Sequence, residues 1–380
     1  MHKKKILIIV PSLMFGGGAE KVASALSLNL YNHYDVSILT FFHYDEIYPY
    51  KGKYYTIGES HHFSRFFTRF IKMQRIIEMI DPDIIITFMN KTSFWVIPIK
   101  YLTKLNAPLI INVNTNPNFH YRKRFYGKFL IRFLYPLKKI DQIVPVSKEL
   151  KKILVNKYRI NADKIIPIYN GFDIERIQKL AKENVSNQDD IFNNQNLIKF
   201  ITIGRLSKEK GHIYLIKAFS RVIREIPNSR LFIIGEGPLK GKLMKLVEKF
   251  QLEKKIFLLG SIKNPYKYIS KAEIFVLSSL HEGLPTVLIE ALACGLPIIS
   301  TNCETGPKEI LGNGRYGILT EVADSSGLAE KMKYLANNEE VREKFSRQAT
   351  TQANLYKVEK FTQNWIEIID DVINKTKLIS

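Results

Sequence analysis

Short hydrophobic runs alternate with helical patterns along the chain. The runs lack regular polar alternation, and five fall in each half of the sequence: KILIIV, DVSILTF, DIIITFM, PLIINV and QIVPVS, then KFITIG, RLFIIG, KIFLLG, EIFVLS and PIIST. Strands of this kind are typical of parallel sheets that helices cover on both faces. Two such series predict an α/β protein of two Rossmann-like, doubly wound domains that face a central cleft.

A polar, Asn-rich segment, AKENVSNQDDIFNNQNLIK at 181–199, lies between the two series. Because it has little to bury, it indicates a connection or an early loop of the second domain. We therefore predict domains at 1–170 and 171–355. Residues 356–380 are predicted as an amphipathic helix that packs back across the domains through one apolar face: Phe361, Trp365, Ile368, Ile369 and Ile373.

The chain is strongly basic, with 57 Lys and Arg against 36 Asp and Glu and a formal net charge of +21. This excess favours an anionic partner: a nucleotide, a phosphate, a membrane surface or nucleic acid. The two cysteines lack metal-ligand spacing, which favours a reducing compartment. No run reaches the roughly 18 apolar residues of a membrane span. Pro11 interrupts the first apolar run, so we expect a buried strand there rather than a signal peptide.

A glycine-rich loop, PSLMFGGGAEKVAS, follows the first predicted strand. Its glycines let the backbone approach a ligand closely, and the helix that begins beyond them favours an anion at its N-terminus. Gly17 and Gly18 are therefore candidate residues for binding an anionic ligand. The spacing is not the G-x-G-x-x-G of dinucleotide-binding proteins. A tight turn without a ligand is the alternative.

Two later loops carry charged side chains at predicted strand ends. GRLSKEKG, residues 204–211, places Arg205 and Lys210 where an Arg fork and a Lys point charge can hold a diphosphate. LHEGLPTVLIEALAC, residues 280–294, places Glu282 in a turn and Glu290 on the helix that follows.

The backbone at the start of that helix is a candidate anion site, formed by Gly283, Leu284, Pro285 and Thr286. Two carboxylates spaced around such a site suit a sugar nucleotide, whose diphosphate lies between a sugar and a ribose. The alternative is that Glu282 caps the turn and Glu290 is a surface residue of the helix.

These motifs resemble those of a known enzyme family. HEGLPTVLIEALACGLPII is similar to the E-x7-E region of retaining glycosyltransferases of the GT-B fold, particularly family four. GGGAE, VPVSKEL, YNGFD, GRLSKEKG and IGEGPL follow the family's order over most of the chain. The resemblance implies that Glu282 contacts the donor sugar and Glu290 the ribose, while Arg205 and Lys210 hold the diphosphate. It thereby gives Glu282, Arg205 and Lys210 catalytic roles.

The reaction that the resemblance implies is retaining transfer of a hexosyl or N-acetylhexosaminyl group from a nucleotide diphosphate, with UDP-sugar as the expected donor. The anionic ligand expected at Gly17 and Gly18 is this nucleotide-sugar donor. Negative charge develops on the departing diphosphate, where Arg205 and Lys210 are fixed donors. We therefore expect neither a metal nor another cofactor. DPD at 81–83 imitates a D-x-D metal motif, but it directly precedes a buried strand.

A basic and aromatic segment, FHYRKRFYGKFLIRFLYPLKK at 119–139, contains no acid. On a helical wheel its aromatic and leucine residues share one half, and Arg124, Lys128 and Arg132 lie on the other. This arrangement suits an anionic membrane surface, and the alternative is a core helix with a solvated basic face. Relatives often carry a histidine near this region, and Asn114 or His120 stands close to that place.

Residues 1–150 carry 21 basic and 10 acidic groups, which favours a lipid-linked or otherwise anionic acceptor in the N-terminal domain. We expect a cytoplasmic enzyme, peripheral on the inner face of the cell membrane, that extends a lipid-linked glycan in surface polysaccharide, lipopolysaccharide or glycoprotein synthesis. We expect no nucleic-acid partner, because no binding module accompanies the charge. The alternatives are a transferase for a soluble or diacylglycerol acceptor, and a non-catalytic nucleotide-sugar-binding subunit of a glycan assembly complex.

Overall fold

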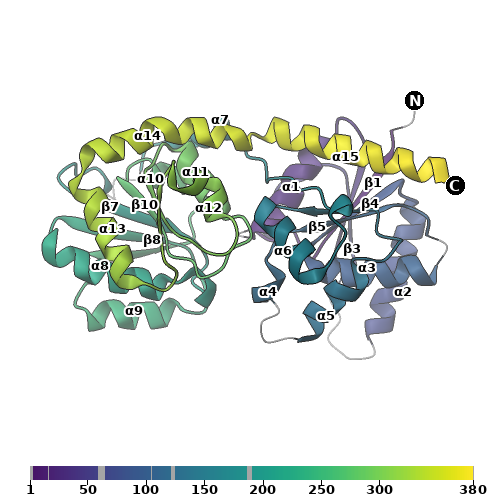
Figure 1. Ribbon diagram of the computed structural model, residues 1–380, viewed down its shortest axis with the longest axis horizontal. Helices are drawn as coiled ribbons and strands as arrows, with labels where there is room; N and C mark the ends of the chain where they lie inside the picture. Colours follow the sequence, from purple (N-terminus) through teal and green to yellow (C-terminus); the bar gives the residue numbers. More distant parts are fainter. Residues whose placement is uncertain are drawn as a thin grey trace. The chain divides into compact units, whose positions relative to one another are not determined.

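The computed structural model describes residues 3–15, 17–58, 65–103, 105–120, 125–185 and 191–379. The chain divides into two compact units: unit 1 is Met1–Gly171 with Val358–Ser380, and unit 2 is Phe172–Lys357. Each unit contains a six-stranded parallel sheet with helices between its strands (Figure 1). The predicted class of two doubly wound α/β domains is confirmed.

Unit 1 has the strand order β3-β2-β1-β4-β5-β6. The strands are β1 (Lys5–Val10), β2 (Asp35–Thr40), β3 (Lys53–Thr56), β4 (Ile84–Phe88), β5 (Leu109–Val113) and β6 (Gln142–Pro145). The helices are α1 (Gly18–Leu30), α2 (Arg65–Ile80), α3 (Met89–Leu102), α4 (Pro117–His120), α5 (Phe125–Leu134), α6 (Lys148–Tyr158) and α15 (Val358–Ile379). β4 and β5 are buried at every residue, which explains their lack of polar alternation.

The core on one face of the unit 1 sheet joins residues from both ends of the chain. Ile6 and Ile8 of β1 and Leu26 of α1 are buried there, together with Trp365 of α15. Helices α1 and α15 lie side by side on this face (Figure 1). The chain therefore returns to unit 1 at Val358 and completes that unit's core with α15.

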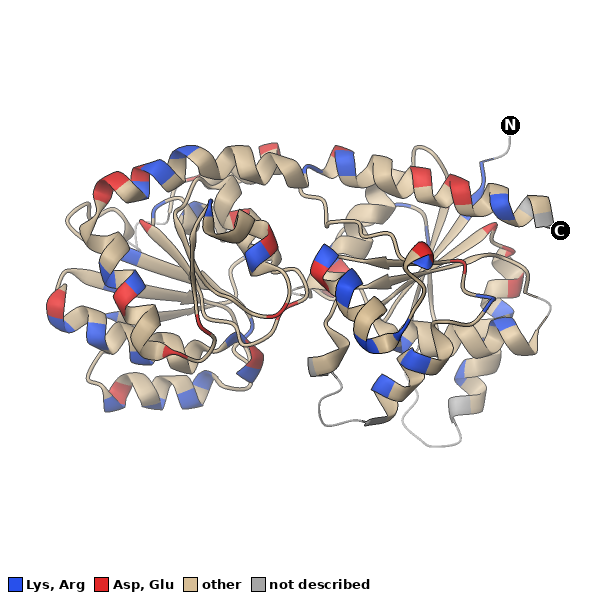
Figure 2. Cartoon of the chain, viewed as in Figure 1, with Lys and Arg blue, Asp and Glu red and all other residues tan. Residues whose placement is uncertain are grey.

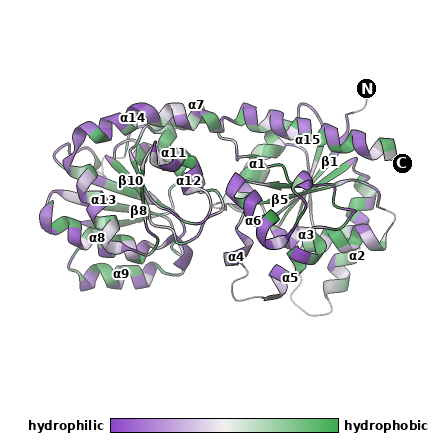
Figure 3. Ribbon diagram, in the orientation of Figure 1, coloured by the Kyte–Doolittle hydropathy of each residue, from purple (hydrophilic) through white to green (hydrophobic). Residues whose placement is uncertain are grey.

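Unit 2 has the strand order β12-β11-β10-β7-β8-β9. The strands are β7 (Ile198–Ile203), β8 (Ser229–Ile234), β9 (Ile256–Gly260), β10 (Ile274–Leu277), β11 (Ile298–Thr301) and β12 (Ile318–Thr320). The helices are α7 (Ile174–Ala181), α8 (His212–Glu225), α9 (Lys240–Lys249), α10 (Tyr266–Ile269), α11 (Thr286–Ala293), α12 (Pro307–Ile310), α13 (Ser325–Asn337) and α14 (Glu339–Ala353). Most helices of both units are amphipathic and show mixed hydrophobic and hydrophilic bands (Figure 3).

In each sheet the first strand of the unit pairs with the fourth: β1 with β4, and β7 with β10. From the two strands of each pair, the chain continues toward opposite edges of the sheet: from β1 to β2 and from β4 to β5, and likewise from β7 to β8 and from β10 to β11. The loops at the carboxyl ends of the paired strands therefore diverge. In open α/β sheets, ligands bind at such switch points. None of the helices in the described residues combines the length and the apolar composition that a transmembrane span requires.

Candidate functional site

The switch point of unit 2 brings together the two charged loops that the sequence singles out. The loop at 204–211 follows β7, and the loop at 278–285 follows β10. Ser278 Oγ donates to Lys210 O at 2.9 Å, and Leu280 N donates to Glu209 O at 2.7 Å. Gly211 has a φ of +64°, and a Cβ there would collide with Ser278 O. The two loops thus pack backbone to backbone.

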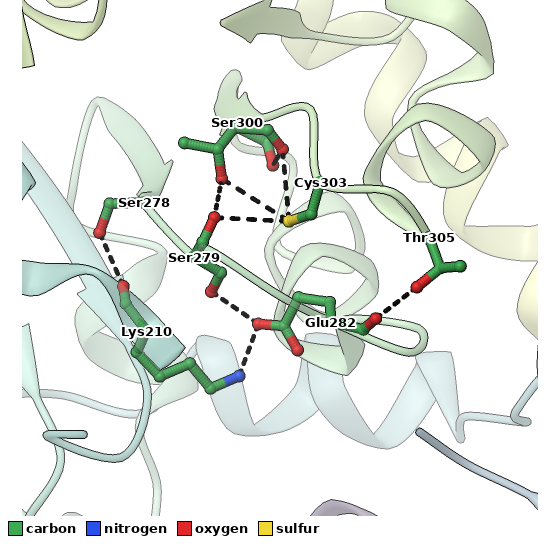
Figure 4. A network of polar contacts seen from close by, with 8 residues as sticks. Lys210, Ser278, Ser279, Glu282, Ser300, Cys303 and Thr305 are labelled. Carbon is green, nitrogen blue, oxygen red and sulfur yellow. Dashed lines mark hydrogen bonds and ion pairs between the residues drawn. The ribbon is translucent and has the colours of Figure 1, made fainter. Parts of the chain in front are cut away.

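Lys210 and Glu282 form an ion pair across these loops (Figure 4). Lys210 Nζ lies 2.6 Å from Glu282 Oε1, and Ser279 Oγ donates to the same oxygen at 2.6 Å. The carboxylate is 10% exposed and the lysine side chain 24%. Two of the predicted site residues are therefore in direct contact, in a place that is shielded from most solvent.

Arg205 lies on the same loop as Lys210, and its side chain is exposed. The guanidinium is close to Glu209. Hydrogen bonds from Ser207 and from its own backbone N–H lower the pKa of the Glu209 carboxyl, and Arg205 lowers it further. The loop thus directs Lys210 to Glu282, whereas Arg205 and Lys208 are exposed to solvent.

Helix α11 begins next to Glu282. Pro285 is its N-cap residue, with no side-chain cap, and Thr286 is the first helical residue. The backbone from Gly283 to Pro285 is buried, including Leu284. The N–H groups of the first helical turn have no side-chain cap, and they give this end of the helix a partial positive charge.

Glu290 is buried on α11, with 5% of its surface exposed, so it is not the surface residue of the alternative interpretation. Cys294 lies one turn further along α11. Burial, and secondly the charge of Glu290, raise the pKa of Cys294 to about 12. The first carboxylate therefore pairs with Lys210 at the mouth of the turn, and the second lies within the unit.

A third loop, which follows β11, was not singled out from the sequence. Thr305 Oγ1 donates to the backbone oxygen of Glu282 (Figure 4). Thr301, the last residue of β11, donates through Oγ1 to Ser279 O at 2.5 Å. Cys303 Sγ also donates to Ser279 O, at 3.4 Å. These hydrogen bonds hold the backbone at Ser279 and Glu282. In the sequence these residues form the alternating pattern T-x-C-x-T at a strand end. The pattern indicates a contact with the Glu282 turn only once β11 is known to pair with β10.

His212 begins α8 directly after the Lys210 loop and is 3% exposed. Burial, and secondly the charge of Lys210, lower the pKa of His212 to about 4. The imidazole is therefore neutral at pH 7, and it adds no positive charge to the site.

The glycine loop of unit 1 accommodates a carboxylate of the chain itself. A Cβ at Gly17 would collide with the carboxylate of Glu20, whereas a Cβ at Gly18 would meet open space. Burial raises the pKa of Glu20. Glu20 was not among the predicted site residues, although it lies in the GGGAE motif on which the family resemblance partly rests.

Asn114 follows β5, and both polar atoms of its amide are buried without a hydrogen-bond partner in the structure. His120 is the last residue of α4, and its side chain lies outside the described part. Arg124 also lies outside the described residues. Lys128 is half-buried and Arg132 is exposed, both on α5. The Asn114 amide can therefore still donate and accept hydrogen bonds.

Burial of α5 does not follow the aromatic and leucine half that the helical wheel predicts, because the fully buried Ile131 lies outside that half. Ile131 is fully buried, whereas Tyr126, Phe129 and Phe133 are 56%, 49% and 54% exposed. Phe129 and Phe133 contact each other, with ring centroids 4.1 Å apart. Lys and Arg are the charged residues of this helix, which has no acid (Figure 2). The helix therefore packs on the core with one edge and exposes an aromatic row beside its cations.

No group of three or more potential metal ligands among His, Cys, Asp and Glu occurs in the part of the chain that the structure describes. The predicted groups at the unit 2 switch point are the cations Arg205 and Lys210, the Glu282 carboxylate and the α11 N-terminus. Such a set can hold a diphosphate directly and bond a hydroxyl through Glu282.

Known proteins match both units. The sequence models of glycosyltransferase family 4 and of glycosyl transferases group 1 match residues 16–176 and 184–352. An uncharacterized glycosyltransferase of Methanocaldococcus jannaschii is 34% identical over 343 residues, covering 80% of this chain and 83% of the relative. A Campylobacter jejuni enzyme is 32% identical over 304 residues and 79% of both chains. Its name is N-acetylgalactosamine-N,N'-diacetylbacillosaminyl-diphospho-undecaprenol 4-alpha-N-acetylgalactosaminyltransferase.

The fold has a close match among solved structures. The crystal structure of Anabaena HepE, in complex with UDP and glucose, aligns with a TM-score of 0.80 at 18% identity, covering 97% of this chain and 100% of HepE. Sequence motifs, fold and relatives therefore agree, and the chain belongs to the family 4, group 1 glycosyltransferases of the GT-B fold.

Proposed function

We propose that the protein is a retaining glycosyltransferase that moves a hexosyl or N-acetylhexosaminyl group from a UDP-sugar to a lipid-linked glycan. The observation that carries this proposal is the Lys210–Glu282 pair at the unit 2 switch point, with Arg205 on the same loop and the α11 N-terminus beside it. A diphosphate matches the cations and the helix end. A sugar hydroxyl matches the carboxylate.

In this reaction the bond between the anomeric carbon and the β-phosphate oxygen breaks, and a bond from that carbon to the acceptor oxygen forms. The departing diphosphate takes up the electron pair of the broken bond, and the proton of the acceptor hydroxyl passes to the diphosphate or to water. Lys210, Arg205 and the N–H groups of α11 are positioned to stabilise the charge that develops on the diphosphate, in a largely shielded site. This charge set supports transfer without a metal. Glu290 is assigned to the ribose and the Gly283–Thr286 backbone to the diphosphate.

A lipid-linked acceptor is supported by the Campylobacter relative, whose name specifies a diphospho-undecaprenol-linked substrate. We assign the acceptor to unit 1, where Asn114 offers an amide with no partner and Glu20 holds its carboxylate beside Gly17. Amides and a carboxylate suit the hydroxyls of a glycan better than a phosphate. The product would be an extended lipid-linked glycan for a surface polysaccharide, lipopolysaccharide or glycoprotein.

Such an acceptor places the enzyme at a membrane, and we assign the contact to α2 and α5. Helix α3 contacts both, so the three cover one face of unit 1. Phe67 and Ile71 of α2 are 73% and 46% exposed, in addition to the aromatic row of α5. Exposed aromatic rings beside lysine and arginine suit the headgroup region of an anionic leaflet. The location would be the cytoplasmic face of the cell membrane.

The membrane contact is tested by sedimentation with phosphatidylcholine vesicles, with and without phosphatidylglycerol. Reversing the charges of Lys128 and Arg132 should weaken binding roughly 100-fold or more, because each cation near an anionic surface is worth about 1 kcal/mol. Replacing Phe129 and Phe133 by serine should also weaken binding. Tyr334→Ser, at a similarly exposed position of unit 2, is the control. Absence of binding by the unmodified protein at low salt would refute the contact.

The activity is tested by incubating the purified protein with a panel of sugar nucleotides and a bacterial membrane extract, followed by mass analysis of the lipids. We expect a lipid product heavier by one sugar residue, formed much more slowly by the Lys210→Ala variant. NMR of the product should show the anomeric configuration of the donor. Nucleotide-sugar binding without transfer to any acceptor would refute the enzymatic proposal and favour a non-catalytic subunit.

A further inference from the structure

The end of β11 and the loop after it carry three buried side chains at every second residue: Thr301, Cys303 and Thr305. They are 1–3% exposed, whereas the intervening Asn302 is half-buried and Glu304 is exposed. An extended chain directs alternate side chains to one side. These three residues therefore form a row on one side of the loop, here called the 301/303/305 row.

The row donates hydrogen bonds to both ends of the segment Ser279–Glu282 (Figure 4). At the first end, Ser279 O accepts from Thr301 Oγ1 at 2.5 Å and from Cys303 Sγ at 3.4 Å. At the second end, Glu282 O accepts from Thr305 Oγ1. The backbone of this segment is thus held at both ends by the neighbouring loop.

The same segment carries the side-chain contacts of Glu282. Ser279 Oγ and Lys210 Nζ both lie 2.6 Å from Glu282 Oε1. A shift of the backbone at Glu282 would change both distances and would move the second carboxylate oxygen. Held in this way, the carboxylate meets a ligand without first reorganising.

The residue after Thr305 keeps this loop against the turn. Gly306 has a φ of +96°, and a Cβ there would collide with the ring of Pro285 and approach Gly283 O to 3.0 Å. Only glycine adopts this conformation without strain at such close range. The Thr305 hydroxyl is thereby kept within reach of Glu282 O.

We infer that Thr305 is a positioning residue, whose hydrogen bond to Glu282 O sets where the Glu282 carboxylate meets the donor sugar. This inference rests on the proposed function, because it assumes that Glu282 contacts the donor. It also predicts an order of effects within the row. Ser279 O has two side-chain donors, so loss of Thr301 leaves Cys303 in place. Among the described residues, Thr305 is the side-chain donor found at Glu282 O.

The test compares four variants: Thr305→Val, Thr305→Ser, Thr301→Val and, as a control, Thr320→Val, which alters a buried threonine of β12 outside the row. Steady-state kinetics give kcat and the KM for the donor. We expect Thr305→Val to lower kcat roughly 10- to 100-fold with KM changed by less than about threefold, the signature of an interaction needed mainly in the transition state. Thr305→Ser keeps the hydroxyl and should restore most of kcat. Thr301→Val should lose less than Thr305→Val.

Hydrogen exchange of the amides at 280–288, followed by mass spectrometry, gives a second readout that needs no acceptor. Exchange should be faster in Thr305→Val than in Thr305→Ser or Thr320→Val. A wild-type kcat in Thr305→Val, or a Thr305→Ser variant as slow as Thr305→Val, would overturn the inference. If the unmodified protein transfers no sugar, the proposed function fails, and unchanged exchange in Thr305→Val then separately refutes the positioning role.

Discussion

The ion pair between Lys210 and Glu282 leads to opposite expectations for binding and for transfer in a Glu282→Gln variant. Lys210 Nζ is held 2.6 Å from Glu282 Oε1, so a diphosphate that recruits Lys210 has to compete with this carboxylate. Glutamine keeps the size and an acceptor oxygen, but it carries no charge. We therefore expect the variant to bind UDP more tightly and to transfer the sugar more slowly.

The magnitudes follow from the burial of the pair. Two unit charges 4 Å apart attract by about 4 kcal/mol at an effective dielectric constant of about 20. Because Lys210 is 24% and Glu282 10% exposed, hydration offsets much of this, and a net restraint of about 1–2 kcal/mol remains. Its release would tighten UDP binding roughly 5- to 30-fold. Loss of a charged hydrogen bond to the donor sugar, worth about 1.5–3 kcal/mol, would lower kcat/KM roughly 10- to 150-fold.

Titration calorimetry with UDP and initial rates of sugar transfer measure the two effects separately. Glu225→Gln is the matched control. Glu225 is the last residue of α8 and forms another ion pair of unit 2, with Lys333, so the variant also removes a carboxylate from an ion pair. The control should change UDP affinity by less than about twofold. If UDP affinity falls in Glu282→Gln in parallel with the rate, then Lys210 does not move from the carboxylate to the diphosphate and the reasoning is wrong.

Three further predictions concern stability and metal dependence. Trp365→Ala removes a fully buried side chain of α15 that stacks on Phe88, and it should cost about 3–5 kcal/mol in urea unfolding of unit 1; a loss below about 1 kcal/mol would contradict the packing role. His212, with its pKa lowered to about 4, stays neutral in the fold while the unfolded chain takes up a proton below about pH 6.5. Stability should therefore fall from about pH 6.5 toward pH 4 by up to about 1.4 kcal/mol per pH unit, and the slope should be smaller in His212→Gln. Transfer should continue in EDTA, whereas loss of activity that Mg²⁺ or Mn²⁺ restores would show that a metal takes part.

The strands inside each sheet were predictable because they are buried on both faces and read as unbroken apolar runs. The two strands that were missed, β3 and β12, are edge strands. β3 consists of half-buried and exposed residues, and β12 is only three residues long. A strand that is partly solvated needs no apolar run, so periodicity does not reveal it.

The site was predictable where a residue type already fits its chemistry, as with Lys210 and Glu282. It was not predictable where the role depends on sheet order. Thr305 and Ser279 come from loops after different strands, and only the pairing of β10 with β11 brings them to the same turn. The wheel of α5 likewise grouped its aromatic and leucine residues on one half, but it could not show that Ile131, outside that half, packs in the core while Phe129 stays exposed.

The packing of α15 in unit 1 has a consequence for protein synthesis. Unit 2, residues 172–357, is made in full before the ribosome reaches the helix that covers Ile6 and Ile8. At about 5–20 residues per second, the hydrophobic face of the nascent first sheet would wait roughly 10 to 40 s for this cover. During that time the face is open to wrong partners, so the nascent chain should depend on a chaperone until α15 emerges.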